Sequence, residues 1–153
     1  MAIYQVEPLI HDIQDLRRQI KSLTHDVSLT PTPEIHHRVT EDLRALIHVG
    51  HELRGFIGAV ERQYEETLRS FAGKRRAFIT ADPHYKKALK NARTVHKDDS
   101  IVIRELAVSM SATQHVLEQR SPTALWEGVR HLLHELKHLE SLLLRLKHHL
   151  EEQ

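Results

Sequence analysis

The C-terminal segment of the chain, from about residue 121, repeats apolar side chains at alternating steps of three and four residues. An average step of 3.5 residues is the period of a helix seam that packs lengthwise against other helices. Ser121 and Pro122 are typical of a helix cap and first turn. The pattern therefore predicts a long amphipathic helix with a buried seam made of Leu125, Val129, Leu132, Leu136, Leu139, Leu143, Leu146 and Leu150.

Additional leucines widen this seam beyond two positions per heptad, because Leu133, Leu142 and Leu144 flank it. A stripe of that width contacts more than one neighbouring helix. The helix is therefore central in a bundle or shared with another subunit, and the width favours a homo-oligomer. The predicted partner interface comprises Leu132, Leu133, Leu136, Leu139, Leu142, Leu143 and Leu146.

Three further segments show the same period. The first extends from Val6 to Val27 through Leu9, Ile13, Leu16, Ile20 and Leu23 and ends before Pro31. Thr32 and Pro33 suit the cap and first turn of the next helix. The second covers about residues 34–71 with a seam of Leu43, Leu46, Gly50, Leu53, Ile57, Val60 and Tyr64. The third begins after Asp82 and Pro83, bends or restarts at residues 97–100, and continues through Ile103, Leu106, Met110, Thr113 and Leu117.

These segments predict an all-α fold, an antiparallel up-down bundle of four long helices, or of five, with coiled-coil-like seams. A length of 153 residues fits one domain, residues 1–153, with a tip at about residues 69–97. Gly50 in the second seam permits a close helix crossing or a kink, or is merely tolerated. Gly73 is a plausible helix cap, and residues 74–80 form a loop or further helical turns.

The basic segment, residues 69–97, holds nine Lys or Arg side chains and one acid, Asp82. The remaining residues hold 13 basic and 20 acidic side chains, so a net charge of +1 hides a strong internal asymmetry. Such asymmetry indicates an anionic partner. The predicted anion-binding residues are Lys74, Arg75, Arg76, Lys86, Lys87, Lys90, Arg93 and Lys97.

Four of these cations share one helix face, because Lys86, Lys90, Arg93 and Lys97 follow each other at steps of four, three and four. Lys87 lies beside them, and Tyr85, Leu89 and Ala92 occupy a different face. Like charges at these spacings repel, so an anion that neutralises them stabilises the helix. Nucleic acid bound through its phosphates, with Phe78 and Tyr85 stacking on unpaired bases, is the favoured partner. An acidic protein, an anionic membrane surface and a solvated lysine face are the alternatives.

Fourteen histidines are unusual for a chain of this length. His131, His134 and His138 lie at steps of three and four on the last helix, on the outward side of its seam, and form a weak candidate metal site. Glu34 with His37, and Glu135 with His138, spell the Glu-x-x-His element of di-iron bundles, but no seam position is expected to hold a carboxylate. No bound metal or cofactor is therefore predicted.

No phosphate loop, nucleophile elbow, dinucleotide fingerprint or inward-facing acid/base pair occurs in the sequence, so we expect no enzymatic activity. The absence of cysteine and of long apolar runs favours an intracellular, cytoplasmic protein with no transmembrane segment. We predict a self-associating bundle that binds nucleic acid or another polyanion with little sequence specificity. The alternatives are an oligomeric scaffold that binds a partner protein helix through its leucine faces and, less favoured, a di-iron-like bundle.

Overall fold

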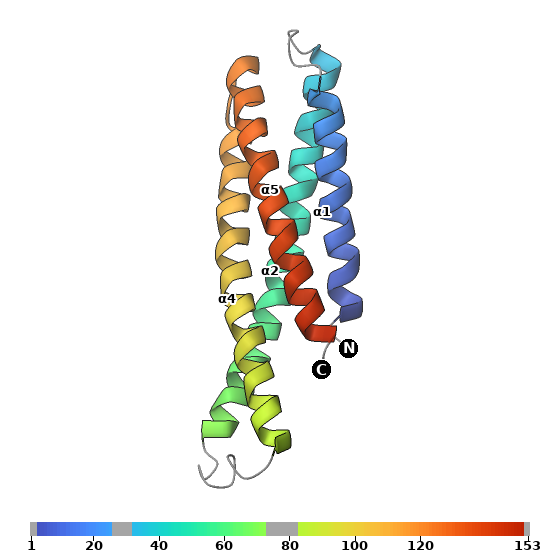
Figure 1. Cartoon of the computed structure of the whole chain (residues 1–153). Coiled ribbons are helices and arrows are strands. Elements are labelled where there is room, and N and C mark those ends of the chain that lie inside the picture. Colours follow the sequence, from blue (N-terminus) through green and yellow to red (C-terminus); the bar gives the residue numbers. More distant parts are fainter. Residues whose placement is uncertain (1–2, 26–31, 73–82, 152–153) are drawn as a thin grey trace.

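Four long helices packed against each other form the protein (Figure 1). The structure, a computed structural model, describes residues 3–25, 32–72 and 83–151. Its helices are α1 (Ile3–Thr24), α2 (Pro33–Ala72), α4 (Pro83–Leu117) and α5 (Pro122–Glu151), and these ranges contain no strand. The predicted all-α bundle is therefore confirmed.

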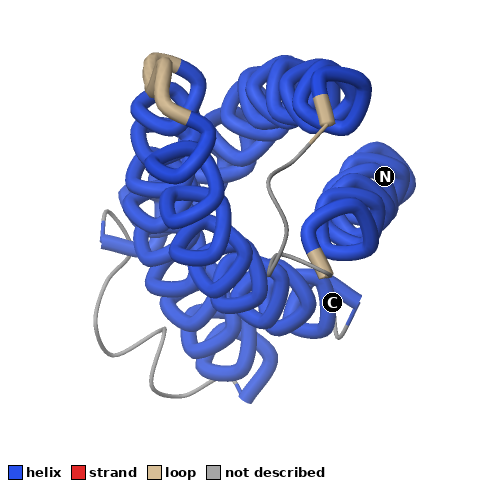
Figure 2. Tube along the Cα trace, turned by 90° about the horizontal axis from the view of Figure 1, so that it is seen from above, coloured by secondary structure: helices blue, strands red, loops and turns tan. Residues whose placement is uncertain are grey.

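Consecutive helices run antiparallel and are neighbours in space. α1 packs on α2, α2 on α4, α4 on α5, and α5 closes the ring against α1. Viewed along the bundle axis, the four helices surround a common interior (Figure 2). This is the up-down arrangement that short connections between amphipathic helices favour.

Two helix starts follow the chemistry that the sequence predicts. The Thr32 Oγ1 accepts a hydrogen bond from the backbone N–H of Ile35 at 3.2 Å, and Pro33 is the first residue of α2. The backbone carbonyl of Ser121 accepts a bond from the N–H of Leu125 at 2.9 Å. Proline is tolerated at both starts because the first helical N–H groups have no partner within the helix.

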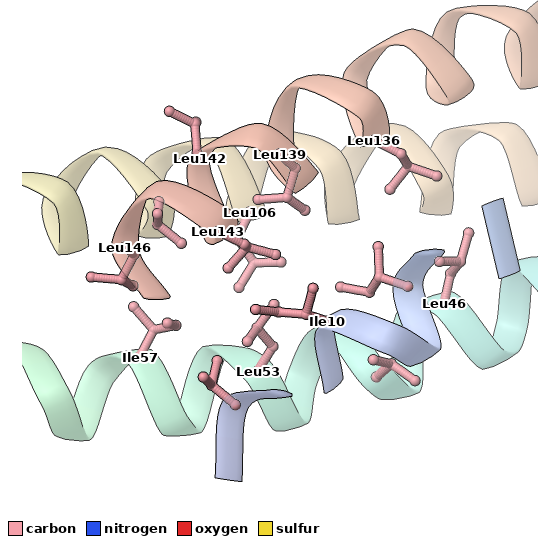
Figure 3. Packing of buried hydrophobic residues seen from close by; sticks show 14 of the residues in the cluster. Ile10, Leu46, Leu53, Ile57, Leu106, Leu136, Leu139, Leu142, Leu143 and Leu146 are labelled. Atoms are coloured by element: carbon pink, nitrogen blue, oxygen red, sulfur yellow. The ribbon is translucent and has the colours of Figure 1, made fainter. Parts of the chain in front are cut away.

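The predicted seams of α2 and α5 form the core. All seven predicted positions of α2 and all eight of α5 are buried. Figure 3 shows Leu53 and Ile57 of α2 facing Leu143 and Leu146 of α5, with Ile10 of α1 beside them. In α1, Val6, Ile13 and Ile20 are buried, Leu9, Leu16 and Leu23 are half-buried, and Val27 lies outside the described residues.

Gly50 marks a close contact between α2 and α4. It is buried, and a Cβ atom built on it would lie 3.0 Å from the Cγ of Met110 on α4. Gly55 and Gly58 have open space at the same position. Of the alternatives for Gly50, the structure supports a packing role, because the Met110 side chain occupies the space that a Cβ would need, whereas no described atom lies within 4 Å of that position at Gly55 and Gly58.

α4 is one unbroken helix, so the alternative of a restart at residues 97–100 is wrong. Its buried seam also differs from the predicted one and runs through Ala92, Val95, Asp99, Val102, Leu106, Ser109, Thr113 and Val116. Ile103, Met110 and Leu117 lie beside it and are half-buried. Leu106 and Thr113 were predicted correctly, but the rest of the seam was missed because the prediction followed mainly apolar side chains, and the observed seam includes Asp99 and Ser109.

The expectation that no seam position holds a carboxylate is corrected by the same helix. Asp98 and Asp99 are both buried, and Asp99 has no exposed surface at all. Steps of four and three lead from Val95 to Asp99 and on to Val102, so continuity of the helix forces this aspartate inward.

α2 and α4 extend beyond the ends of α1 and α5, where only the two of them pack together (Figure 1). The contact of Asp98 with His149 shows where the last turn of α5 meets α4. We call residues 65–72 and 83–97 the two-helix extension and the rest of the described chain the four-helix body. The extension carries the described part of the basic segment.

Candidate functional site

The basic stripe consists of Lys86, Lys87, Lys90, Arg93 and Lys97 on α4, and all five residues are exposed. No acidic residue lies between Pro83 and Lys97. Within the described ranges, none of the five cations forms an ion pair. The structure thus brings together the predicted cations of this helix on the part of the molecule with the fewest neighbouring elements.

Two cations at the interface of α1 and α5 in the four-helix body, by contrast, form ion pairs. The Arg17 Nε lies 2.8 Å from the Glu140 Oε2, joining α1 to α5. The Lys147 Nζ lies 2.9 Å from the Glu7 Oε1, joining the same two helices. The bond to Lys147 lowers the pKa of Glu7, and the bond to Glu7 raises the pKa of Lys147. These cations have a structural partner, whereas the basic stripe is available for an external one.

A shallow groove of about 770 Å³ runs along the stripe. Leu89 and the aliphatic stems of the lysines supply its apolar surface, and the charged ends supply its rim. It is lined by Pro83, Lys86, Lys87, Leu89, Lys90, Arg93 and Thr94. Its chemistry suits an extended anion that presents charge at its edge and apolar surface behind it.

The aromatic residues near the stripe have a packing role. Tyr85 is half-buried, and its ring meets that of Phe71 on α2 edge to face at a centroid distance of 6.0 Å. This pair holds the two helices of the extension together. The predicted stacking of Tyr85 on a base would require the ring to leave this contact. Phe78, Lys74, Arg75 and Arg76 lie outside the described residues.

The candidate metal histidines stand apart from the core. His131, His134 and His138 are all exposed on α5, as the sequence predicts. Over the ranges that the structure describes, no group of three or more His, Asp or Glu side chains is placed to hold a metal ion. Glu135 instead lies near Glu105 of α4; burial, followed by interaction with Glu135, raises the pKa of Glu105.

The predicted partner-interface leucines lie mostly inside the chain's own core. Leu132, Leu136, Leu139, Leu142, Leu143 and Leu146 are buried, and Leu133 is half-buried. Leu144, which flanks the seam, is 45% exposed. The width of the leucine stripe is explained by contacts of α5 with both α4 and α1.

A buried acidic cluster lies where the body meets the extension, and the sequence reasoning missed it. The junction cluster consists of Asp98 and Asp99 of α4, Glu61 and Tyr64 of α2, and His149 of α5. The Nδ1 of His149 hydrogen-bonds the Oδ2 of Asp98. The Ser100 hydroxyl lies 3.5 Å from the Glu61 Oε1, while both carboxylate oxygens of Asp99 have no hydrogen-bond partner.

This environment raises the pKa of Asp99 to about 8, chiefly because the carboxyl is removed from water and further because Glu61 and Asp98 lie nearby. Burial, followed by the charge of Asp99, raises the pKa of Tyr64. The signal that could have revealed the cluster is the seam of α4 itself, since continuing the steps back from Leu106 passes through Val102 and Asp99 to Val95.

None of the four helices in the described ranges combines the length and hydropathy needed to cross a membrane. Comparisons of the chain with family models, curated proteins and solved structures find no match. The functional argument therefore rests on the geometry of this chain alone.

Proposed function

We propose that the protein binds nucleic acid through the basic stripe, with little sequence specificity. The observation that supports this proposal is a set of five exposed cations with no acidic residue among them in α4 from Pro83 to Lys97 and, within the described ranges, no ion pair. Repulsion among neighbouring cations of one helix face is relieved when phosphates neutralise them. A nucleic acid backbone supplies those phosphates at regular spacing.

The dimensions of the stripe fit several phosphates. From Lys86 to Lys97 a helix advances about 16 Å, at about 1.5 Å per residue. Duplex DNA carries one charge per about 3.4 Å of helix axis on each strand, so a duplex whose axis runs parallel to the stripe has about five phosphates of each strand within this length. The five cations of the stripe can neutralise at most about five phosphates, so the expected log-log slope of affinity against salt is at most about −4.5.

We expect contacts to the nucleic acid backbone to dominate, because the described residues around the stripe include no base-reading element. Tyr85 is engaged with Phe71, and the remaining lining side chains are Leu89, Thr94 and Pro83. Phosphate contacts fix position and affinity but carry no sequence information directly. We therefore expect similar affinities for unrelated sequences of equal length.

The test is fluorescence anisotropy of the protein with random-sequence single- and double-stranded DNA and RNA over a salt series. The variant Lys86→Glu, Lys90→Glu, Arg93→Glu should lose at least tenfold in affinity and flatten the salt slope by about 3, because each removed phosphate contact contributes about 0.9 to it. Helicity measured by circular dichroism should stay unchanged, since all three side chains are exposed.

A matched control makes the same change in net charge elsewhere. Arg54, Arg130 and Arg145 are exposed residues of the four-helix body, and the variant with all three changed to glutamate should bind much more tightly than the stripe variant. Equal losses in the two variants would show that overall charge, not the stripe, drives binding. Absence of binding by the unaltered protein at low salt would retire the proposal and favour the scaffold.

Self-association and the protein scaffold remain predictions with a narrower basis. Six of the seven leucines proposed for a partner are already covered by the chain itself. Leu144, together with the half-buried Leu133, is the part of that leucine face left accessible on α5. Sedimentation equilibrium of the unaltered protein measures the oligomeric state directly, and a monomer would remove self-association from the proposal.

A further inference from the structure

The junction cluster contains a buried carboxyl group without the cation partner that neutralises charge at the α1–α5 interface. Asp99 is 0% exposed, and among the described residues neither of its carboxylate oxygens finds a hydrogen-bond partner. An ionised carboxylate in such a place loses its hydration without gaining donors or a cation in return. A neutral carboxyl group costs far less to bury, so the fold favours a bound proton on this side chain.

The charged neighbours of Asp99 also favour the protonated form of its carboxyl group. Glu61 and Asp98 oppose a second negative charge beside them. On α5, His149 is engaged with Asp98, and Lys147 bonds Glu7 of α1 and lies 3.8 Å from Glu151. The titratable groups that the structure places around Asp99 are thus Glu61 and Tyr64 of α2, Asp98 of α4 and, through its bond to Asp98, His149 of α5.

The position of the cluster gives the proton a structural consequence. The last turn of α5 contacts α4 through the hydrogen bond between His149 and Asp98. The adjacent Asp99 lies on the side of α4 that faces α2. A charge appearing on Asp99 would act on both contacts, because Asp98 and Glu61 are its neighbours. Three packed helices therefore meet at one protonation site, next to the start of the two-helix extension.

We propose that the Asp98–Asp99 pair is a proton-controlled latch, which holds the last turn of α5 against α4 while Asp99 is protonated and releases it when Asp99 ionises. The latch does not rest on nucleic acid binding, since the basic stripe occupies the exposed face of α4 and Asp99 its buried face. The proton passes to solvent when the site opens, and no other chemical change is involved.

The sign of the pH dependence follows from the two states of Asp99. Unfolded, the carboxyl has the ordinary pKa of 3.8, whereas in the folded chain the pKa is about 8. Between these values the folded chain holds a proton that the unfolded chain has released, so stability falls as pH rises. The unfolding equilibrium constant should grow by up to tenfold per pH unit from this group and level off above about pH 8.

The experiment compares the unaltered protein with Asp99→Asn by urea unfolding from about pH 5 to about pH 8. The amide keeps the shape of the carboxyl group but cannot ionise, so the difference in midpoint between the two proteins should widen in favour of Asp99→Asn as pH rises. Asp42→Asn is the matched control, because Asp42 is a half-buried aspartate of α2 that lies outside the junction cluster. Its difference from the unaltered protein should change much less with pH. A constant midpoint difference for Asp99→Asn overturns the proposal.

Nuclear magnetic resonance of the unaltered protein supplies a second test that survives failure of Asp99→Asn to fold. The carboxyl carbon of Asp99 should titrate near pH 8, and amide signals of α5 from Lys147 to Glu151 should shift or broaden with the same midpoint. Glu61→Gln should lower that midpoint because it removes a neighbouring negative charge. Titration of Asp99 near pH 4, or α5 amides indifferent to its ionisation, would overturn the latch.

Discussion

The α1–α5 interface of the four-helix body and the basic stripe of the two-helix extension use charged residues in opposite ways. In the body, Arg17 and Lys147 bind acids across the α1–α5 interface, so their charges are neutralised within the protein. In the extension, five cations of α4 face solvent without an ion pair in the described ranges. Charges at an interface between helices pair with each other and orient the two helices. Charges on the exposed face of α4, which has a single neighbour in the extension, can contact an external partner.

The two regions also differ in how they are held together. The body buries the continuous seams of α2 and α5 together with Ile10 and Ile13 of α1. The part of the extension on α4 buries Ala92 and Val95 and adds the edge contact of Phe71 with Tyr85. The comparison predicts a stable body and a weaker extension whose own charges oppose its stability.

The largest effect is expected from truncating the core of the body. Leu143→Ala should lower the free energy of unfolding by about 3 kcal/mol, since it removes a buried side chain and leaves a cavity where α2 and α5 meet. Leu89→Ala, in the half-buried part of the extension, should cost about 1 kcal/mol or less. Urea unfolding of both variants measures the difference, and similar losses would contradict a distinction between body and extension.

A smaller effect separates paired from unpaired cations. Arg17 and Glu140 are mostly buried at 19% and 15% side-chain exposure, and a double-mutant cycle with alanine should give a coupling free energy of about 1 kcal/mol. The same cycle applied to Arg93 and Glu61 should give a value near zero. A coupling for Arg93 as large as that for Arg17 would show that the stripe is used internally.

The smallest effect tests whether the stripe costs stability. Lys90→Glu changes repulsion with Lys86 and Arg93 into attraction, because these residues lie one helical turn away on either side. Each changed pair is worth a few tenths of a kcal/mol at low salt, so the variant should be more stable by about 0.5 to 1 kcal/mol while binding nucleic acid less tightly. Thermal unfolding at low and high salt checks this, and a destabilised variant would show that Lys90 supports the fold.

Much of the fold could be predicted because its information is local and periodic. The seams of α2 and α5 are apolar at every step except Gly50, so every position that a count of three and four predicts is buried; Val39, Val49, Trp126 and Leu142 are buried in addition. Thr32 with Pro33, and Ser121 with Pro122, mark helix starts through short-range hydrogen bonding. The candidate stripe was predictable for the same reason, since its cations lie within one helix and share one face.

The seam of α4 was less predictable because its polar residues take part in the packing. Asp99, Ser109 and Thr113 are buried on the same face as Val102 and Leu106. Thr113 suits a helix interior because its hydroxyl donates to the carbonyl of Ser109 at 2.7 Å, whereas the Ser109 hydroxyl has no hydrogen-bond partner within the described residues. The carboxyl group of Asp99 makes no such bond among the described residues, so its raised pKa is explained only by the residues packed around it in the folded chain.

The sequence by itself determined the four helices, the buried faces of α2 and α5 and the concentration of positive charge in residues 69–97, because helix period and charge are properties of the chain. Tertiary structure decided which charges are neutralised and which remain accessible. Arg17 meets Glu140 across 123 residues, and His149 meets Asp98 across 51. Partners this distant are fixed by helix lengths and by the level at which α5 ends on α4, and no local pattern encodes either contact.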